Sequence, residues 1–169
     1  MAPWRVEPAE VDEAPCPGET PKAHVARLAH RKAETVARRH PGAVVLGADT
    51  VVVAGRQILP KADDAATARS CLERLSGRRH RVLTAVTVID SAGIARHRLS
   101  DTLVAVKRLS RAEIEAYLAS GEWQGKAGGY AIQGRFEAHV RFLRGSFSGV
   151  MGLPLFETAA LLRTAGALG

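Results

Sequence analysis

The stretch Ala43-Val-Val-Leu-Gly-Ala-Asp-Thr-Val-Val-Val53 decides the fold. It is short, apolar and rich in β-branched residues, which predicts a buried strand. One carboxylate, Asp49, lies in its middle and is followed by Thr50. A buried carboxylate is costly unless a cation compensates it. Two interpretations stay open: Asp49 caps a turn between two short strands, or it is held at a strand end for metal binding or general-base catalysis.

A helix expected before this strand offers a candidate cation. Thr20-Pro21 predicts its start, with Thr as the N-cap and Pro at the first helical position, and His40-Pro41-Gly42 predicts its end. Lys32 falls on the apolar stripe of this helix, four residues from both Leu28 and Val36. A lysine that faces the core needs an anion, whereas one at the edge of the stripe extends to the surface. The sequence leaves both interpretations open.

Helical and strand patterns alternate along the rest of the chain. Helices are expected over residues 63–77, 110–121 and 155–162, and strands over residues 58–59, 80–89, 103–106 and 139–143. Because a short turn at Ser91-Ala-Gly93 joins two of these strands, they should pair antiparallel. No G-x-G-x-x-G motif follows a strand. The pattern therefore predicts an α/β fold with a mixed sheet, not a doubly wound nucleotide-binding fold.

Length and cysteine content narrow the class of protein. A chain of 169 residues predicts one domain, or two small lobes that share a sheet. No apolar run approaches the roughly 20 residues of a transmembrane helix, and the first residues lack the apolar core of a signal peptide. Cys16 and Cys71 lie far apart and form no metal-binding pattern. These features predict a reduced, cytoplasmic location.

The net charge of +7 suggests an anionic partner. The basic residues are scattered, however, and aromatic residues do not alternate with the arginines. This distribution argues against nucleic-acid binding and is compatible with a small phosphate-bearing ligand.

A glycine-rich segment, Gly125-Lys-Ala-Gly-Gly-Tyr-Ala-Ile-Gln-Gly134, follows the helix expected at 110–121. Its four glycines predict unusual backbone angles or the close approach of a ligand. A flexible loop is the simpler alternative, but Tyr130, Ile132 and Gln133 give the segment a content that a linker would lack.

Eight segments in order resemble one family, the Maf family of nucleoside triphosphate pyrophosphatases, which has the inosine-triphosphate-pyrophosphatase-like fold. The segments are Val11-Asp-Glu13, Leu28-Ala-His-Arg-Lys-Ala33, Leu46-Gly-Ala-Asp-Thr-Val51, Ile58-Leu-Pro-Lys61, Leu75-Ser-Gly77, His80-Arg-Val-Leu-Thr84, Lys126-Ala-Gly-Gly-Tyr-Ala-Ile-Gln-Gly134 and Val150-Met-Gly-Leu-Pro154. Each alone is weakly specific, but together they span nearly the whole chain.

The resemblance implies a hydrolase that cleaves between the α and β phosphates and releases a nucleoside monophosphate and pyrophosphate. It implies a divalent metal cation, Mg²⁺ or Mn²⁺, and a cytoplasmic enzyme of nucleotide metabolism with no nucleic-acid or membrane partner. A homodimer is common among similar proteins. The implied fold is a single α/β domain over residues 1–169, with an elongated mixed β-sheet, flanking helices and two lobes around a central cleft.

The family's functional residues match positions of this sequence. Asp49 matches the proton acceptor and a metal-site carboxylate, and Glu13 matches a second active-site acid at the metal. Lys32 and Lys61 match lysines that are expected to meet the phosphates. A metal can neutralise phosphate oxygens and lower the pKa of an attacking water, and lysines stabilise charge that develops during transfer.

Two further positions separate the branches of the family. Thr50 after the aspartate, together with Gln133, is similar to the dTTP/UTP-preferring branch, whereas the 7-methyl-GTP branch usually has glutamate at the position of Gln133. An uncharged amide can pair with the donor and acceptor edge of a pyrimidine. It does not reject every purine by itself, so selectivity also needs the shape of the pocket.

The sequence departs from the family at its N-terminus. Family members begin with a strand and a Ser-x-Ser-Pro-Arg-Arg loop that is expected to bind the triphosphate, whereas Pro3-Trp-Arg-Val6 already matches the segment that follows. We therefore expect this strand and loop to be missing. Either the true start lies upstream, or the short form has weak or no activity. The alternative function is a non-catalytic nucleotide-binding or regulatory protein, related to cell division or the septum, that has lost the phosphate loop.

Overall fold

The computed structural model describes residues 5–169. Pro3 and Trp4, which begin the segment matched above, lie outside the described residues. The helices are α1 (Pro21–Arg39), α2 (Ala65–Leu75), α3 (Arg111–Ser120), α4 (Phe147–Val150) and α5 (Leu155–Thr164), with a 3₁₀ helix, η1, at Arg135–His139. The strands are β1 (Val45–Ala54), β2 (Gln57–Leu59), β3 (Arg79–Ile89), β4 (Ala95–Val106) and β5 (Val140–Arg144).

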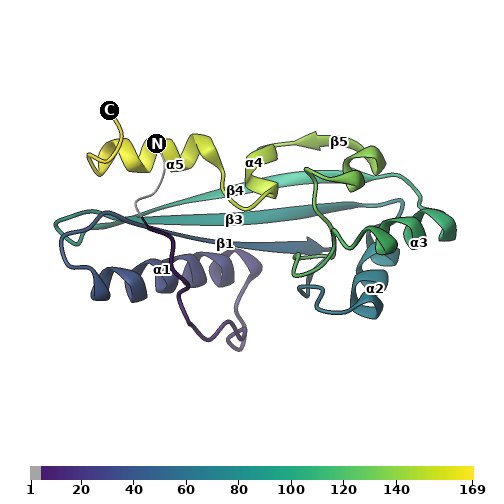
Figure 1. Cartoon of the computed structure of the whole chain (residues 1–169), viewed down its shortest axis with the longest axis horizontal. Coiled ribbons are helices and arrows are strands. Elements are labelled where there is room, and N and C mark those ends of the chain that lie inside the picture. Colours follow the sequence, from purple (N-terminus) through teal and green to yellow (C-terminus); the bar gives the residue numbers. More distant parts are fainter. Residues whose placement is uncertain (1–4) are drawn as a thin grey trace.

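The five strands form one sheet in the order β2-β1-β3-β4-β5. The α/β class is confirmed, but the expectation of a mixed sheet is wrong for the described strands, because all four pairings are antiparallel. Short turns join β1 to β2 and β3 to β4, which forces antiparallel pairing. The longer connections through α2 and α3 stay at one end of the sheet (Figure 1). After α3 the chain re-enters the sheet at the end that it left, so β5 runs opposite to β4. Strands β2 and β3 both pair antiparallel with β1 and therefore run in the same direction on either side of it.

The helices lie in two groups along this elongated sheet (Figure 1). In the first, α1 packs on one face, where Val25 and Ala29 contact Val51 and Leu83. On the opposite face, Leu161 of α5 packs with apolar residues of β3. In the second group, α2 and α3 share a larger core with the glycine-rich segment at the other end of the sheet. This arrangement agrees with the expected two lobes.

Local signals in the sequence account for most element boundaries. The Thr20 side chain accepts a hydrogen bond from the amide of Ala23 at the start of α1. Asp64 caps α2, and Ser110 and Glu113 form the capping box of α3. No helix among residues 5–169 is long and apolar enough to cross a membrane.

Candidate active site

Helix α1 packs closely against β1 because residue 47 is glycine. A Cβ atom at Gly47 would lie 2.6 Å from both the carbonyl oxygen of Ala29 and the amide nitrogen of Ala33. No side chain fits in that space, so the helix backbone rests directly on the strand. This contact places Lys32 of α1 opposite Asp49 of β1.

Lys32 binds two carboxylates at once. Its ammonium lies 2.6 Å from Asp49 Oδ1 and 2.7 Å from Glu13 Oε1. The other oxygen of Glu13 lies 2.9 Å from the ammonium of Lys61. Lys32 therefore faces anions and not solvent alone, and the interpretation of Asp49 as a mere turn cap is wrong because Asp49 lies inside the continuous strand β1. Four of the predicted site residues thus form one connected cluster.

The two acids of this cluster have opposite protonation tendencies. Burial raises the pKa of Asp49, and the neighbouring Lys32 only partly offsets this effect. Hydrogen bonds from Lys32 and Lys61 lower the pKa of Glu13 to about 2. Burial alone would lower the pKa of Lys32, but its two carboxylate partners outweigh burial and raise it. A pair of acids whose pKa values are driven apart is typical of sites in which one acid takes up a proton and the other stays ionised.

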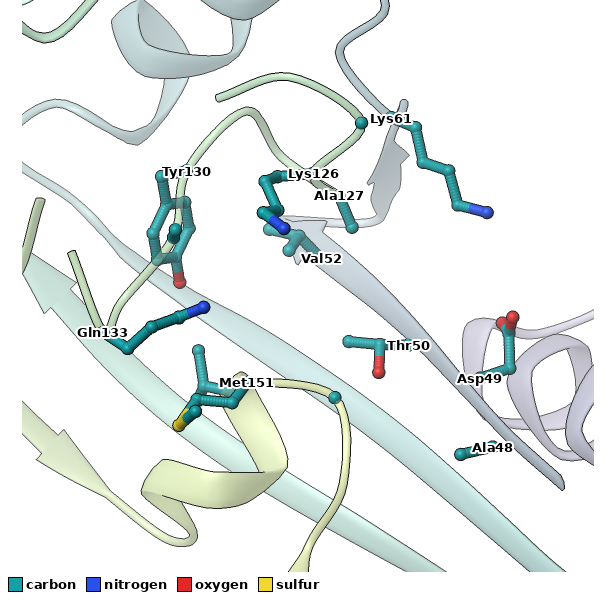
Figure 2. A pocket seen from close by; sticks show the side chains of 14 residues that line it. Ala48, Asp49, Thr50, Val52, Lys61, Lys126, Ala127, Tyr130, Gln133 and Met151 are labelled. Carbon is teal, nitrogen blue, oxygen red and sulfur yellow. The ribbon is translucent and has the colours of Figure 1, made fainter. Parts of the chain in front are cut away.

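A pocket opens beside this cluster, and Asp49, Thr50, Lys61 and Gln133 line it. In Figure 2 Asp49 and Lys61 lie at one end and Tyr130 and Gln133 at the other, with Thr50 between them. Lys32 and Glu13 are absent from the lining, and Lys32 contacts both Glu13 and Asp49. The structure therefore brings all six predicted residues to one region and divides them between the pocket wall and its support.

Consecutive residues of β1 can both reach the pocket because this part of the strand lies at an edge. Among residues 5–169, β2 pairs with β1 only from Val52 to Ala54. Upstream of Val52 the described partner of β1 is β3 alone. Asp49 and Thr50, whose side chains point to opposite faces of the sheet, can thus both line the pocket at this edge.

The glycine-rich segment is a fixed wall of the pocket and not a flexible loop. The amide of Ala62 donates to the carbonyl of Lys126 at 3.0 Å, and the amide of Gly125 donates to the carbonyl of Ala62 at 2.8 Å. Gly128 has φ +67°, and a Cβ there would lie 2.9 Å from Val52. Both the backbone angle and the packing therefore require glycine at this position.

Sequence reasoning assigned no role to several of the pocket residues, and two of these, Lys126 and Met151, have long side chains. The Lys126 ammonium points into the pocket, and Met151 closes the side near Gln133 (Figure 2). Both residues belong to segments that carry the family resemblance, so their position in those motifs was the available signal. Lys126 adds a second exposed cation to the pocket wall beside Lys61.

The donor atoms around Asp49 fit a divalent cation only in part. No group of three or more His, Cys, Asp or Glu side chains that could hold a metal occurs among the described residues. The carboxylates of Asp49 and Glu13 lie close together because both contact the Lys32 ammonium, which occupies the point between them. Mg²⁺ is usually held by one or two carboxylates together with substrate phosphates and water. The residues present thus fit a metal that is bound jointly with a phosphate-bearing ligand.

Comparisons with known proteins agree with this geometry. Residues 1–165 match the model of the family described as Maf-like protein. A dTTP/UTP pyrophosphatase of Novosphingobium aromaticivorans is 57% identical over 98% of this chain and 83% of its own length. Those of Paramagnetospirillum magneticum and Rhodospirillum rubrum are 60% and 56% identical, over 96% and 98% of this chain and 85% and 79% of their own lengths. The chain belongs to the Maf-like protein family.

Proposed function

We propose that this protein hydrolyses dTTP and UTP between the α and β phosphates and releases the nucleoside monophosphate and pyrophosphate. The observation that carries this proposal is the pocket itself, which has a buried carboxylate and a lysine at one end and an uncharged amide at the other. Relatives that are more than half identical to this chain are named dTTP/UTP pyrophosphatases.

Asp49 is the proton acceptor in this reaction. Its carboxylate takes a proton from a water molecule, and the water oxygen forms a bond to the α-phosphorus. The bond between the α-phosphorus and the bridging oxygen breaks, and the electron pair leaves with pyrophosphate. Because burial raises the pKa of Asp49, its carboxylate is a stronger base than an exposed aspartate.

The lysines supply charge on either side of Asp49. Lys32 keeps the buried Asp49 carboxylate ionised and oriented through the contact of 2.6 Å. Lys61 and Lys126 line the pocket, where their charges stabilise the negative charge on the leaving pyrophosphate. Glu13 and Asp49 would hold Mg²⁺ or Mn²⁺, which when bound neutralises phosphate charge and lowers the pKa of an attacking water.

Thr50 and Gln133 contact the nucleoside. The Gln133 amide offers both a donor and an acceptor, which suits the edge of uracil or thymine. Residues 150–152 line the side of the pocket near Gln133 and limit the size of the base that can enter.

The setting of the enzyme follows from the same proposal. We place a single domain over residues 1–169 in the cytoplasm, where its substrates occur. In the described structure both Cys16 and Cys71 are free thiols, as is usual in a reducing compartment. The homodimer stays a prediction, which sedimentation equilibrium of the purified chain would test.

The proposal is tested with a panel of nucleoside triphosphates in the presence of Mg²⁺ or Mn²⁺. UTP, dTTP, CTP, GTP and 7-methyl-GTP are incubated with the protein, and both pyrophosphate and orthophosphate are measured. We expect pyrophosphate and monophosphate from UTP and dTTP in preference to the others. Orthophosphate and a diphosphate as products would contradict the proposed bond. Binding of nucleotide without cleavage would favour the non-catalytic alternative.

A further inference from the structure

The hydroxyl of Thr50 contacts a second threonine, Thr84, which does not line the pocket. Thr84 of β3 is the direct cross-strand partner of Thr50. Its side chain is fully buried, with 0% exposure. The two hydroxyl oxygens lie 2.9 Å apart, and the Thr84 hydroxyl lies 2.7 Å from the carbonyl oxygen of Gly149. The three groups form a short chain that leads from the pocket wall to α4, which ends just before Met151.

The direction of the hydrogen bonds in this chain is fixed by elementary chemistry. A carbonyl oxygen only accepts, so the single proton of the Thr84 hydroxyl is donated to Gly149. The proton between the two threonines must then belong to Thr50. The Thr50 hydroxyl donates to Thr84 and has only lone pairs left for a ligand in the pocket.

The carbonyl at the end of the chain is itself held in place. Ser146 caps α4 and accepts a hydrogen bond of 2.9 Å from the amide of Gly149. A Cβ atom at Gly149 would lie 2.8 Å from the hydroxyl oxygen of Ser100, so the residue packs without room for a side chain. The acceptor for Thr84 therefore cannot rotate away without displacement of α4.

We infer that Thr84 is a specificity-determining positioning residue, which makes Thr50 a hydrogen-bond acceptor and so favours bases that carry an imide N–H. This inference rests on the proposed function and deepens it. Uracil and thymine have a proton on N3 that can be donated to Thr50, whereas N3 of cytosine carries a lone pair. With cytosine, the lone pair of N3 would face the lone pairs of the Thr50 hydroxyl, and neither atom would have a hydrogen-bond partner. Unpaired polar atoms in a binding site are costly in binding free energy.

The position of Thr50 in the pocket is consistent with a contact to the base. In Figure 2 the side chain lies between the Asp49 end and Gln133. With Thr50 as the acceptor for N3–H, the amide nitrogen of Gln133 can donate to a neighbouring carbonyl oxygen of the base. Thr50 and Gln133 together then match one donor and one acceptor of uracil or thymine. Cytosine lacks the N3–H donor and does not match this arrangement.

The test compares Thr84→Val with Thr84→Ser, using the ratio of kcat/KM for UTP to that for CTP. Valine has the shape of threonine but neither accepts from Thr50 nor donates to Gly149, so the Thr50 proton becomes free to face the ligand. We expect the UTP-to-CTP ratio to fall about tenfold. Thr84→Ser keeps the hydroxyl, and the ratio of the wild type should be retained.

A double-mutant cycle distinguishes positioning from a general loss of stability. Thr50→Val removes the hydroxyl at the pocket without a change in the buried layer and should also lower the ratio. If Thr84 acts through Thr50, the double variant Thr50→Val/Thr84→Val has no lower ratio than Thr50→Val alone. Additive effects on the ratio, or an unchanged ratio in both single variants, would overturn the inference.

Two further measurements separate the sources of failure. The ratio of kcat/KM for dUTP to that for UTP should stay unchanged in Thr84→Val, since both nucleotides carry uracil. A change in this ratio, with no change in the UTP-to-CTP ratio, would assign Thr50 to the sugar and overturn the inference.

The binding of UMP and CMP, measured by calorimetry, needs no turnover. A wild type that binds UMP over CMP, with Thr50→Val losing this preference, supports the inference even if hydrolysis fails. Equal binding of UMP and CMP by the wild type contradicts the inference, whether or not UTP is cleaved.

Discussion

The ammonium of Lys32 lies 2.6 Å from a carboxylate oxygen of Asp49, although the two residues are 17 positions apart in the sequence. The contact exists because α1 rests on β1 at Gly47, where a Cβ would meet the helix backbone. It keeps a carboxylate with 7% exposure next to a cation, at the point where the pocket begins.

Removal of the Lys32 charge should affect both activity and stability. Lys32→Met leaves Asp49 buried without its cation, so we expect loss of pyrophosphate release by about 100-fold or more and a loss of about 1–3 kcal/mol in the free energy of unfolding. The double variant Lys32→Met/Asp49→Asn should recover most of the stability but none of the activity. Lys22→Met on the same helix is the matched control for urea unfolding, because Lys22 is 60% exposed and loses only a surface ion pair with Asp101. Equal stability of the two single variants would contradict this description of the pair.

The close packing at Gly47 should be required for the same contact. Gly47→Ala places a methyl group against the backbone of α1, which must move away from β1. We expect a loss of about 1–3 kcal/mol in the free energy of unfolding and lower kcat, because Lys32 is carried away from Asp49. Thermal unfolding and steady-state kinetics check both effects. Wild-type kcat in a clearly destabilised variant would show that the Lys32 contact does not depend on this packing.

Gln133 should set the preference for pyrimidines. Gln133→Glu replaces the amide donor with a second acceptor, so a carbonyl oxygen of uracil would face a carboxylate. We expect kcat/KM for UTP to fall by about tenfold or more relative to that for GTP and 7-methyl-GTP. The exposed Gln124, changed to Glu, is the control for the added charge. An unchanged substrate profile in Gln133→Glu would remove this residue from the specificity site.

His80 should make stability depend on pH. Its ring is buried, its Nε2 atom lies 2.7 Å from the Tyr130 hydroxyl, and its Nδ1 atom has no hydrogen-bond partner among the described residues. Burial lowers the pKa of His80 to about 4. The folded state thus favours the neutral ring, so this contribution to stability is complete above about pH 6.5 and is lost as the pH falls from there towards 4.

The size of this effect can be measured by urea unfolding at pH 7.5 and pH 5. We expect His80 to account for about 2 kcal/mol of the decrease in the free energy of unfolding between pH 7.5 and pH 5. His80→Gln can still bond to Tyr130 but does not titrate, so its loss over the same range should be smaller by that amount. The same loss of stability in both proteins would show that His80 is not held neutral by the fold.

The sequence predicted the elements whose signals are local. The cap at Thr20, the helix expected from residue 110, the turn after Ile89 and the apolar run around Asp49 all lie where they were expected. It missed the first part of β4, since residues 95–102 are mostly polar and qualify as a strand only through pairing with β3. Neither α4 nor η1 was among the helices expected from the sequence.

The sequence predicted which residues form the site more completely than how these residues are arranged. The pattern of α1 placed Lys32 on the apolar stripe, but the sequence left open whether it meets an anion or extends to the surface. The pairing with both Asp49 and Glu13 depends on the tertiary contact at Gly47 and on the course of the N-terminal segment. The chain from Thr50 through Thr84 to Gly149 joins three distant segments and has no pattern in the sequence at all.

The most direct test of the proposed function is pyrophosphate release from UTP by Asp49→Asn beside Asp63→Asn, with wild-type protein and Mg²⁺ or Mn²⁺. The Asp49→Asn change keeps the shape of the side chain but removes its ability to take up a proton from water, whereas Asp63 is exposed and lies outside the pocket. We predict that the Asp49 variant is folded, binds UMP and releases no measurable pyrophosphate, and that the Asp63 variant matches the wild type. Full activity of Asp49→Asn would contradict the assignment of Asp49 as the proton acceptor.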